Sequence, residues 1–200
     1  MISNITWGSD FGDLTNYLIE NRVHEVLHLY GVSSIDTAPA EMAAVASLNA
    51  RAKNTVLHVS LSAAHEDGEL SGPKWMVSVV RIEAVFNLAG HQRVVVRHRD
   101  KFHDHVHIFW CTISVDTGKT PPKQWFLIKG HAHDDIGPHA VKADQIACIP
   151  HNHRALRSYE FRALARCQAV CRELEAELGL RQLRTPQQAA QARLLGETTK

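Results

Sequence analysis

HRDKFHDHVH, residues 98–107, places four histidines and two aspartates within ten positions of the chain. Runs typical of strands flank it, because residues 92–97 and 108–113 are rich in β-branched and aromatic side chains. The intervening residues 101–104 are short and polar enough for a tight reversal. The stretch therefore predicts a β-hairpin, from which the rest of the fold can be built outward.

The predicted hairpin brings three histidines together. Residues i and i+2 of a strand point to the same face, so His105 and His107 share one, and the same spacing relates His98 to Asp100. Opposed side chains of paired strands lie about 5 Å apart, which sets His98 across from the other two imidazoles. Three neutral imidazoles form one wall of a divalent-cation site and leave positions open for water or substrate. Such an open site indicates catalysis.

Other histidines have less specific interpretations. The chain has 14, so a solvated hairpin without metal remains an alternative for the motif. A His-x-His inside an apolar strand argues against it, because burying an unpaired polar group costs about 1–3 kcal/mol. His103 lies in the turn. Two interpretations stay open for His58: it faces the site from its strand, or, as we favour, it is a satisfied core residue. A second His-x-His at His131 and His133 is interpreted as loop histidines.

Composition narrows the class of protein. The 200 residues are 44% hydrophobic and carry a formal net charge of +1, which suits one globular domain and does not indicate a polyelectrolyte binder. No apolar run approaches the ~20 residues that span a bilayer, and a secretory signal pattern is missing at residues 1–7. The four cysteines form no Cys-x-x-Cys pair, which favours a reduced, cytoplasmic setting. Basic residues gather around the hairpin and suit a phosphate-bearing ligand.

The remaining pattern alternates strands and helices. Strands are predicted at residues 2–7, 26–34 and 54–62. Helices are predicted at residues 38–50, 69–88 and 156–179. A further helix is predicted to begin after Asp10, which is its N-cap. Residues 116–153 are rich in proline, glycine and histidine, and a long functional or mobile loop is expected there. The alternation predicts a layered α/β or α+β domain with about five strands, whose order does not follow from the sequence.

Three motifs in this order resemble those of a relaxase of the plasmid mobilisation nuclease family, within the HUH endonucleases. Residues 9–19, SDFGDLTNYLI, resemble the first motif, which carries a nucleophilic tyrosine, here Tyr17. Residues 49–62 resemble the second, which ends in a serine near the DNA, and residues 98–107 resemble the third, the metal site. Residues 171–180 are similar to the helix that closes such domains.

The resemblance implies a fold and the boundaries of the domain. It implies an HUH-type relaxase fold, with a central, mainly antiparallel sheet of about five strands and helices packed on it. The relaxase domain is expected to span residues 1–180, with residues 181–200 as a polar tail or the start of an extension. Residues 119–153 form a longer segment than the family pattern leads one to expect.

The resemblance also implies a function. It implies metal-dependent nicking of single-stranded DNA at a plasmid origin of transfer, through a covalent 5′-phosphotyrosyl intermediate with later rejoining. The working ion would be Mg²⁺ or Mn²⁺, although three histidines by themselves favour Mn²⁺ or Zn²⁺. Implied partners are single-stranded origin DNA, accessory relaxosome proteins and a type IV secretion coupling protein, in the bacterial cytoplasm.

Site residues follow from the motifs. Tyr17 is expected to attack the phosphodiester, and Asp100 either to orient a ligand by accepting a ring N–H or to help remove the tyrosine proton. The expected metal ligands are His98, His105 and His107. The expected DNA contacts are Ser62, Ser60, Arg97, Arg99 and Lys101.

Three alternative functions remain open. An HUH replication initiator or transposase places its tyrosine after the histidine motif, where this chain has only Tyr159. Tyr30, in a predicted strand, is the other rival nucleophile. The second alternative is a non-cutting, metal-stabilised DNA-binding protein, and the third is a metal-dependent hydrolase of small phosphoesters.

Overall fold

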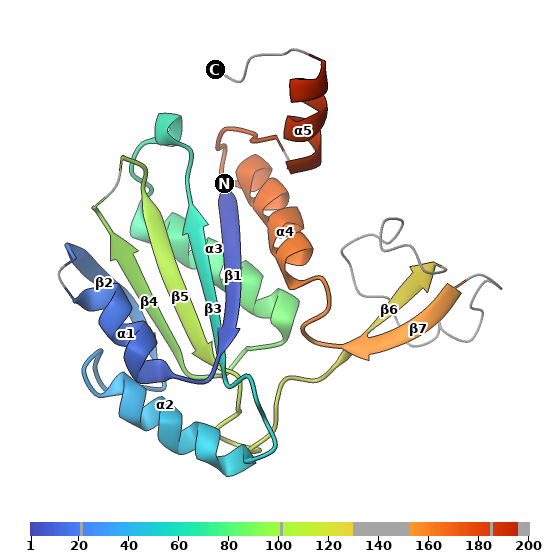
Figure 1. The fold of residues 1–200 in the computed structure, drawn as a ribbon. Coiled ribbons are helices and arrows are strands. Elements are labelled where there is room, and N and C mark those ends of the chain that lie inside the picture. Colours follow the sequence, from blue (N-terminus) through green and yellow to red (C-terminus); the bar gives the residue numbers. More distant parts are fainter. Residues whose placement is uncertain (21, 101, 130–152, 185, 196–200) are drawn as a thin grey trace.

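A five-stranded antiparallel sheet forms the centre of the computed structural model, which describes residues 1–20, 22–100, 102–129, 153–184 and 186–195 (Figure 1). The strand order is β1-β3-β5-β4-β2. The strands are β1 (Ile2–Gly8), β2 (His24–Tyr30), β3 (Val56–Ser62), β4 (Arg93–His98) and β5 (His105–Cys111). The expected antiparallel sheet of about five strands is confirmed, and the predicted hairpin forms its middle.

Helices pack on both faces of this sheet. The helices α1 (Phe11–Ile19) and α2 (Ala38–Ala46) lie on one face, and α3 (Gly72–Phe86) and α4 (Ala163–Glu177) on the other (Figure 1). Successive side chains of a strand point to opposite faces of the sheet, so each strand contributes to both helical layers. Val94 and Val96 pack with α1 and α2, whereas Val95 belongs to the cluster that contains α3 and α4. The sheet is therefore buried on two sides along its central strands.

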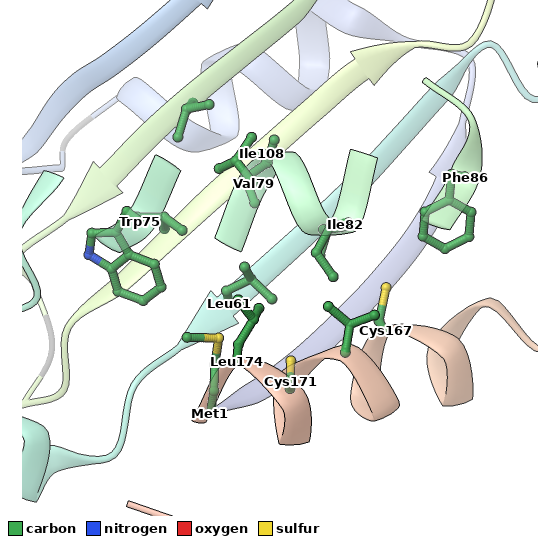
Figure 2. Close-up of a cluster of buried hydrophobic side chains, with 14 of the residues drawn as sticks. Met1, Leu61, Trp75, Val79, Ile82, Phe86, Ile108, Cys167, Cys171 and Leu174 are labelled. Atoms are coloured by element: carbon green, nitrogen blue, oxygen red, sulfur yellow. The ribbon is translucent and has the colours of Figure 1, made fainter. Parts of the chain in front are cut away.

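The larger core lies between the sheet and the pair α3–α4 (Figure 2). Its central side chains are Leu61, Trp75, Val79, Ile82, Phe86, Ile108, Cys167, Cys171 and Leu174. The i, i+4 spacing of the two cysteines keeps them on one stripe of α4, as the apolar pattern predicted. Each fully buried large side chain stabilises the fold by about 1.5–3 kcal/mol, so this layer anchors the sheet that carries the candidate site.

The start of α1 fixes where Tyr17 lies. Asp10 is the N-cap, and its carboxylate accepts a hydrogen bond of 2.8 Å from the Asp13 backbone N–H, as the sequence predicted. Phe11 and Leu18 are buried against the sheet, whereas Tyr17 is 54% exposed. Tyr17 therefore sits in the last turn of α1 with its ring directed out of the core.

The segment after β5 differs from the sequence expectation. Strand β6 (Gln124–Lys129) pairs antiparallel with β7 (His153–Ser158), so the predicted structureless segment contains regular structure, and the last long helix begins at Ala163 rather than near residue 156. The sequence did not reveal this pairing because each strand's partner lies far away in the chain. His131 and His133 lie outside the described residues.

The polar tail contains a further helix, α5 (Pro186–Leu194). Two short 3-10 turns, at Ser47–Asn49 and His65–Asp67, complete the described elements. None of the helices in the described parts of the chain is both long enough and apolar enough to cross a membrane.

Candidate metal centre and active site

Three histidines converge at one end of the β4–β5 hairpin. His98 pairs directly with His105 in the register, and Val96 pairs with His107, so the three imidazoles share one face. One ligand nitrogen from each lies within 4.8 Å of the other two, and all three residues are buried. The structure thus brings together the three residues that the spacing predicted as metal ligands.

Hydrogen bonding decides which nitrogen of His98 faces the cluster. Its Nε2 lies 2.7 Å from the backbone oxygen of Leu18, and a carbonyl oxygen can only accept, so Nε2 carries the hydrogen. Nδ1 then keeps its lone pair, and it is buried without a hydrogen-bond partner among the described residues. Burial lowers the pKa of His98, which favours the neutral ligand form.

His105 is oriented by the turn that precedes it. Its Nδ1 lies 3.2 Å from the backbone oxygen of His103 and donates to it, so Nε2 keeps the lone pair. The Asp100 carboxylate lies 3.5 Å from that same Nε2. A lone pair and a carboxylate facing each other repel, and a cation between them turns the repulsion into attraction.

His107 is held by a chain of polar side chains. Its Nδ1 lies 2.9 Å from His58 Nε2, and His58 Nδ1 lies 3.1 Å from Thr6 Oγ1. Burial, followed by the nearby His98, lowers the pKa of His58 to about 4, so His58 is neutral near pH 7. When His107 donates to His58 and His58 donates to Thr6, Nε2 of His107 keeps a lone pair for a cation.

The contact between His58 and His107 agrees with the less favoured of the two interpretations of His58, that it faces the site from its strand. His58 shares its face of β3 with Ser60 and Ser62, which was visible in the i, i+2 spacing. Only the strand order, which sets β3 beside β5, brings that face to His107. The sequence did not supply this order.

The donor set fits a divalent transition cation. Three imidazole nitrogens suit Mn²⁺ or Zn²⁺, whereas Mg²⁺ prefers oxygen ligands and would draw on water, substrate oxygens or Asp100. The buried lone pair of His98, which the protein itself leaves unsatisfied, supports a bound cation. The hydrogen bonds to Leu18, His103 and His58 hold the three rings as expected for metal ligands.

Tyr17 lies beside this cluster, as expected. Its ring centroid is 6.4 Å from that of His107, and the two planes are nearly perpendicular. Arg22 lies over the Tyr17 ring, 4.6 Å from its centroid, and its Nη1 is 3.1 Å from Asp100 Oδ2. The sequence did not single out Arg22, which links the tyrosine to the carboxylate beside His105.

The other two tyrosines lie elsewhere. Tyr159 packs edge-on against Trp7, 5.8 Å between ring centroids, on the face of the sheet that carries α4. Burial raises its pKa to about 12, which disfavours the phenolate. Tyr30 pairs with Arg93 at the far end of β4, roughly 17 Å along the strand from His98.

Polar residues extend the site across β3 and β1. Ser60 pairs with His107 and Ser62 with His105, so both serines flank the histidines on the same face. Asn4 and Thr6 of β1 continue this polar strip and are exposed. Helices α1 and α2 leave this part of the sheet uncovered (Figure 1).

The basic residues expected to contact DNA differ in their surroundings. Arg97, one of the expected DNA contacts, is buried and donates to Asp104 at 2.7 and 2.8 Å, so its guanidinium is engaged within the protein. Its side chain points to the α3 face, opposite the histidines. Arg99 is about half exposed and pairs with Glu25 at 3.1 Å. Lys101 lies outside the described residues.

The chain matches a known protein family over more than half of its length. A family model described as relaxase, MobA/VirD2-like, nuclease domain matches residues 17–133. The matched range begins at the exposed tyrosine of α1 and contains the whole β4–β5 hairpin. Among curated proteins, none matches the chain.

Proposed function

Because the chain belongs to the MobA/VirD2-like relaxase nuclease family, we propose that it nicks and rejoins single-stranded DNA at a plasmid origin of transfer. Membership supports a nuclease that acts on DNA; the origin of transfer, the covalent intermediate and the role in conjugative mobilisation are our proposal. One observation carries it: Tyr17, the exposed tyrosine of α1, lies 6.4 Å, centroid to centroid, from one of three converging histidines. We assign the nuclease domain to residues 1–180.

The proposed reaction is a transesterification. The phenolic oxygen of Tyr17 attacks the scissile phosphorus, the bond to O3′ breaks, and O3′ leaves as a hydroxyl after taking a proton. The product is a 5′-phosphotyrosyl enzyme, which retains an ester bond, so the reverse attack by a 3′-hydroxyl can rejoin the strand. Tyr17 is 54% exposed, so water can receive the phenolic proton.

The metal ligands in this proposal are His98, His105 and His107. A divalent cation there, Mg²⁺ or Mn²⁺, supplies Lewis-acid withdrawal of charge from a non-bridging phosphate oxygen. Neutral imidazoles do not offset the cation's charge, and burial lowers the pKa of His98, which favours its neutral form.

Arg22 and Asp100 support the tyrosine. The Arg22 guanidinium over the Tyr17 ring stabilises negative charge as it develops on the phenolic oxygen. Asp100, 3.1 Å from Arg22 and 3.5 Å from His105, holds both in place, which favours the orienting role over direct proton removal.

The DNA strand is proposed to follow the uncovered polar strip of the sheet. Ser60 and Ser62 would donate hydrogen bonds to phosphates next to the scissile one, and Arg99 and Lys101 would contact the backbone from the hairpin turn. Accessory relaxosome proteins and a type IV coupling protein are the further partners proposed for this function, in the bacterial cytoplasm.

The test is formation of a covalent protein–DNA adduct. Labelled single-stranded oligonucleotides tiled across the plasmid region that adjoins the gene are incubated with the protein and Mn²⁺, and adducts are resolved on denaturing gels. We expect an adduct with the wild type and with Tyr159→Phe, and none with Tyr17→Phe or with EDTA.

Each alternative function has its own outcome in this experiment. Loss of the adduct in Tyr159→Phe, but not in Tyr17→Phe, would indicate an initiator-type nuclease. Binding without any adduct would indicate a non-cutting DNA-binding protein. Turnover of small phosphoesters without an adduct would indicate a hydrolase.

A further inference from the structure

We propose that Phe102 and His65 form a platform on which one unpaired nucleobase of the bound strand stacks, next to the candidate metal centre. This inference rests on the proposed function, because it needs single-stranded DNA in the site. It adds a base-binding subsite to residues that the metal and the nucleophile do not use.

The platform is a stacked pair of rings. Phe102 lies in the β4–β5 turn and is 81% exposed. One face of its ring stacks on His65, with centroids 3.8 Å apart and 21° between the planes. His65 Nδ1 lies 2.9 Å from the Phe102 backbone oxygen and donates to it, which anchors the imidazole to the turn. With His65 on one side, the exposed area leaves the other face of the phenyl ring open.

The platform lies in the turn between the two strands that carry the histidines. His98 ends β4 and His105 begins β5, so the turn and the histidine cluster are at the same end of the hairpin. A nucleotide whose phosphate reaches the cluster can therefore place its base over the turn. A cavity of about 190 Å³ borders both platform residues. Arg99 also lines the cavity and suits the backbone of the same strand.

The chemistry of the cavity favours a base over a second phosphate. Two carboxylates, those of Glu69 and Asp104, line it together with the aromatic pair. Asp104 is paired with Arg97, whereas the Glu69 carboxylate is mostly exposed and disfavours a phosphate. A neutral base brings no charge and has a flat face for Phe102. Base–aromatic stacking tolerates any sequence, since every base has a π-face.

The experiment compares two probes in a parent that does not cut. In the Tyr17→Phe parent, binding of a labelled mixed-sequence single-stranded oligonucleotide is measured by fluorescence anisotropy. A second probe has the same backbone with abasic sites throughout. We expect Phe102→Ala to weaken binding of the base-bearing probe about tenfold and to leave the abasic probe unchanged. Phe102→Trp should retain the affinity.

The matched control is Tyr30→Ala, another exposed aromatic residue, which lies in β2 beside the end of β4 opposite the turn. It should bind both probes like the parent. Because Phe102 is mostly exposed, its replacement does not disturb the core, and a circular-dichroism melting curve verifies this.

Failure of the platform and failure of the proposed function can be distinguished. Equal affinity of Phe102→Ala and the parent for the base-bearing probe would overturn the platform alone. An equal loss on both probes would also overturn it, because the ring would then act on something other than a base. A parent that binds neither probe would overturn the proposed function, and the platform with it.

Discussion

At the scale of single residues, hydrogen bonds to ring nitrogens decide what the candidate centre can bind. His98 and His105 donate to backbone oxygens, and His107 is held by His58. A cation needs the nitrogen opposite each of these bonds, so the bonds select the tautomer before any ion arrives. Spacing in the sequence predicted that these three rings converge, because i, i+2 alternation and a hairpin are local rules. The partners of the ligands were not predictable, because they come from other strands and from α1.

His58 provides a test at this scale. Replacing His58 with Leu removes the acceptor for the His107 N–H, so we expect Mn²⁺ affinity to fall about 10–100-fold. In His58→Gln the amide oxygen can take the place of Nε2 as acceptor, so this variant should retain most of the affinity. Isothermal titration calorimetry of metal-free protein measures the Mn²⁺ affinity of both variants. An unchanged affinity in His58→Leu would show that His58 has no positioning role.

His91 provides a second test, of stability against pH. It is buried, its Nδ1 donates to the Cys111 backbone oxygen at 3.0 Å, and burial lowers its pKa from 6.5. The folded pKa lies below the unfolded one, so the full stabilisation is present above pH 6.5. It declines as the pH falls from 6.5 toward the folded pKa, because the unfolded chain takes up the proton first.

We therefore expect the melting temperature of metal-free protein to fall between pH 7 and pH 5. His91→Asn should show a smaller fall, although other buried histidines keep part of the trend. Differential scanning calorimetry at matched ionic strength measures the melting temperature of both proteins at each pH. The same fall in melting temperature for the wild type and His91→Asn would exclude a contribution of His91 to this pH dependence.

At the scale of elements, Asp104 ties the hairpin turn to α3. Its carboxylate is buried and accepts hydrogen bonds from Arg97, from the Leu70 backbone N–H at 2.8 Å and from Trp75 Nε1 at 3.1 Å. This carboxylate fixes the turn between the metal-binding strands. The sequence placed Asp104 in a turn but not in contact with α3.

Removing this carboxylate should be costly. Asp104→Ala removes the buried partner of Arg97 and leaves it only the longer contacts with the more exposed Glu69 and Glu25, at 3.4 and 4.0 Å. We expect the free energy of unfolding in urea to fall by about 3–5 kcal/mol. The control is Glu173→Ala, which breaks an ion pair with Arg81 that is about half exposed and should cost about 1 kcal/mol or less. A loss in Asp104→Ala no larger than the control's would contradict the assigned role.

The elements also show what the sequence could and could not predict. The hairpin, α1 with its Asp10 cap and the apolar stripe of α4 were all predicted, because each depends on neighbours within one or two turns. The pairing of β6 with β7 was not, because it joins strands on either side of residues 130–152. Local alternation in His153–Ser158 was too short to distinguish a strand from the start of a helix.

At the scale of the whole molecule, the two faces of the sheet differ: one is buried in the core, and the other carries the candidate site. One face is covered by α3 and α4 and forms the larger core (Figure 2). The other is covered by α1 and α2 over part of its area, and the rest presents the histidines, the serines of β3 and the polar strip of β1 (Figure 1). The rigid core holds the site at a fixed geometry, and the uncovered part gives a strand of DNA access. The strand order β1-β3-β5-β4-β2 creates this division.

The most direct test of the central claim is to identify the residue that becomes linked to DNA. The adduct formed with single-stranded origin DNA is digested, and the nucleotide-bearing peptide is sequenced by mass spectrometry. The account predicts the link at Tyr17, in a reaction that requires a divalent cation and fails when His105 is replaced by Ala. A link at Tyr30 or Tyr159, or an adduct undiminished by EDTA, would contradict it.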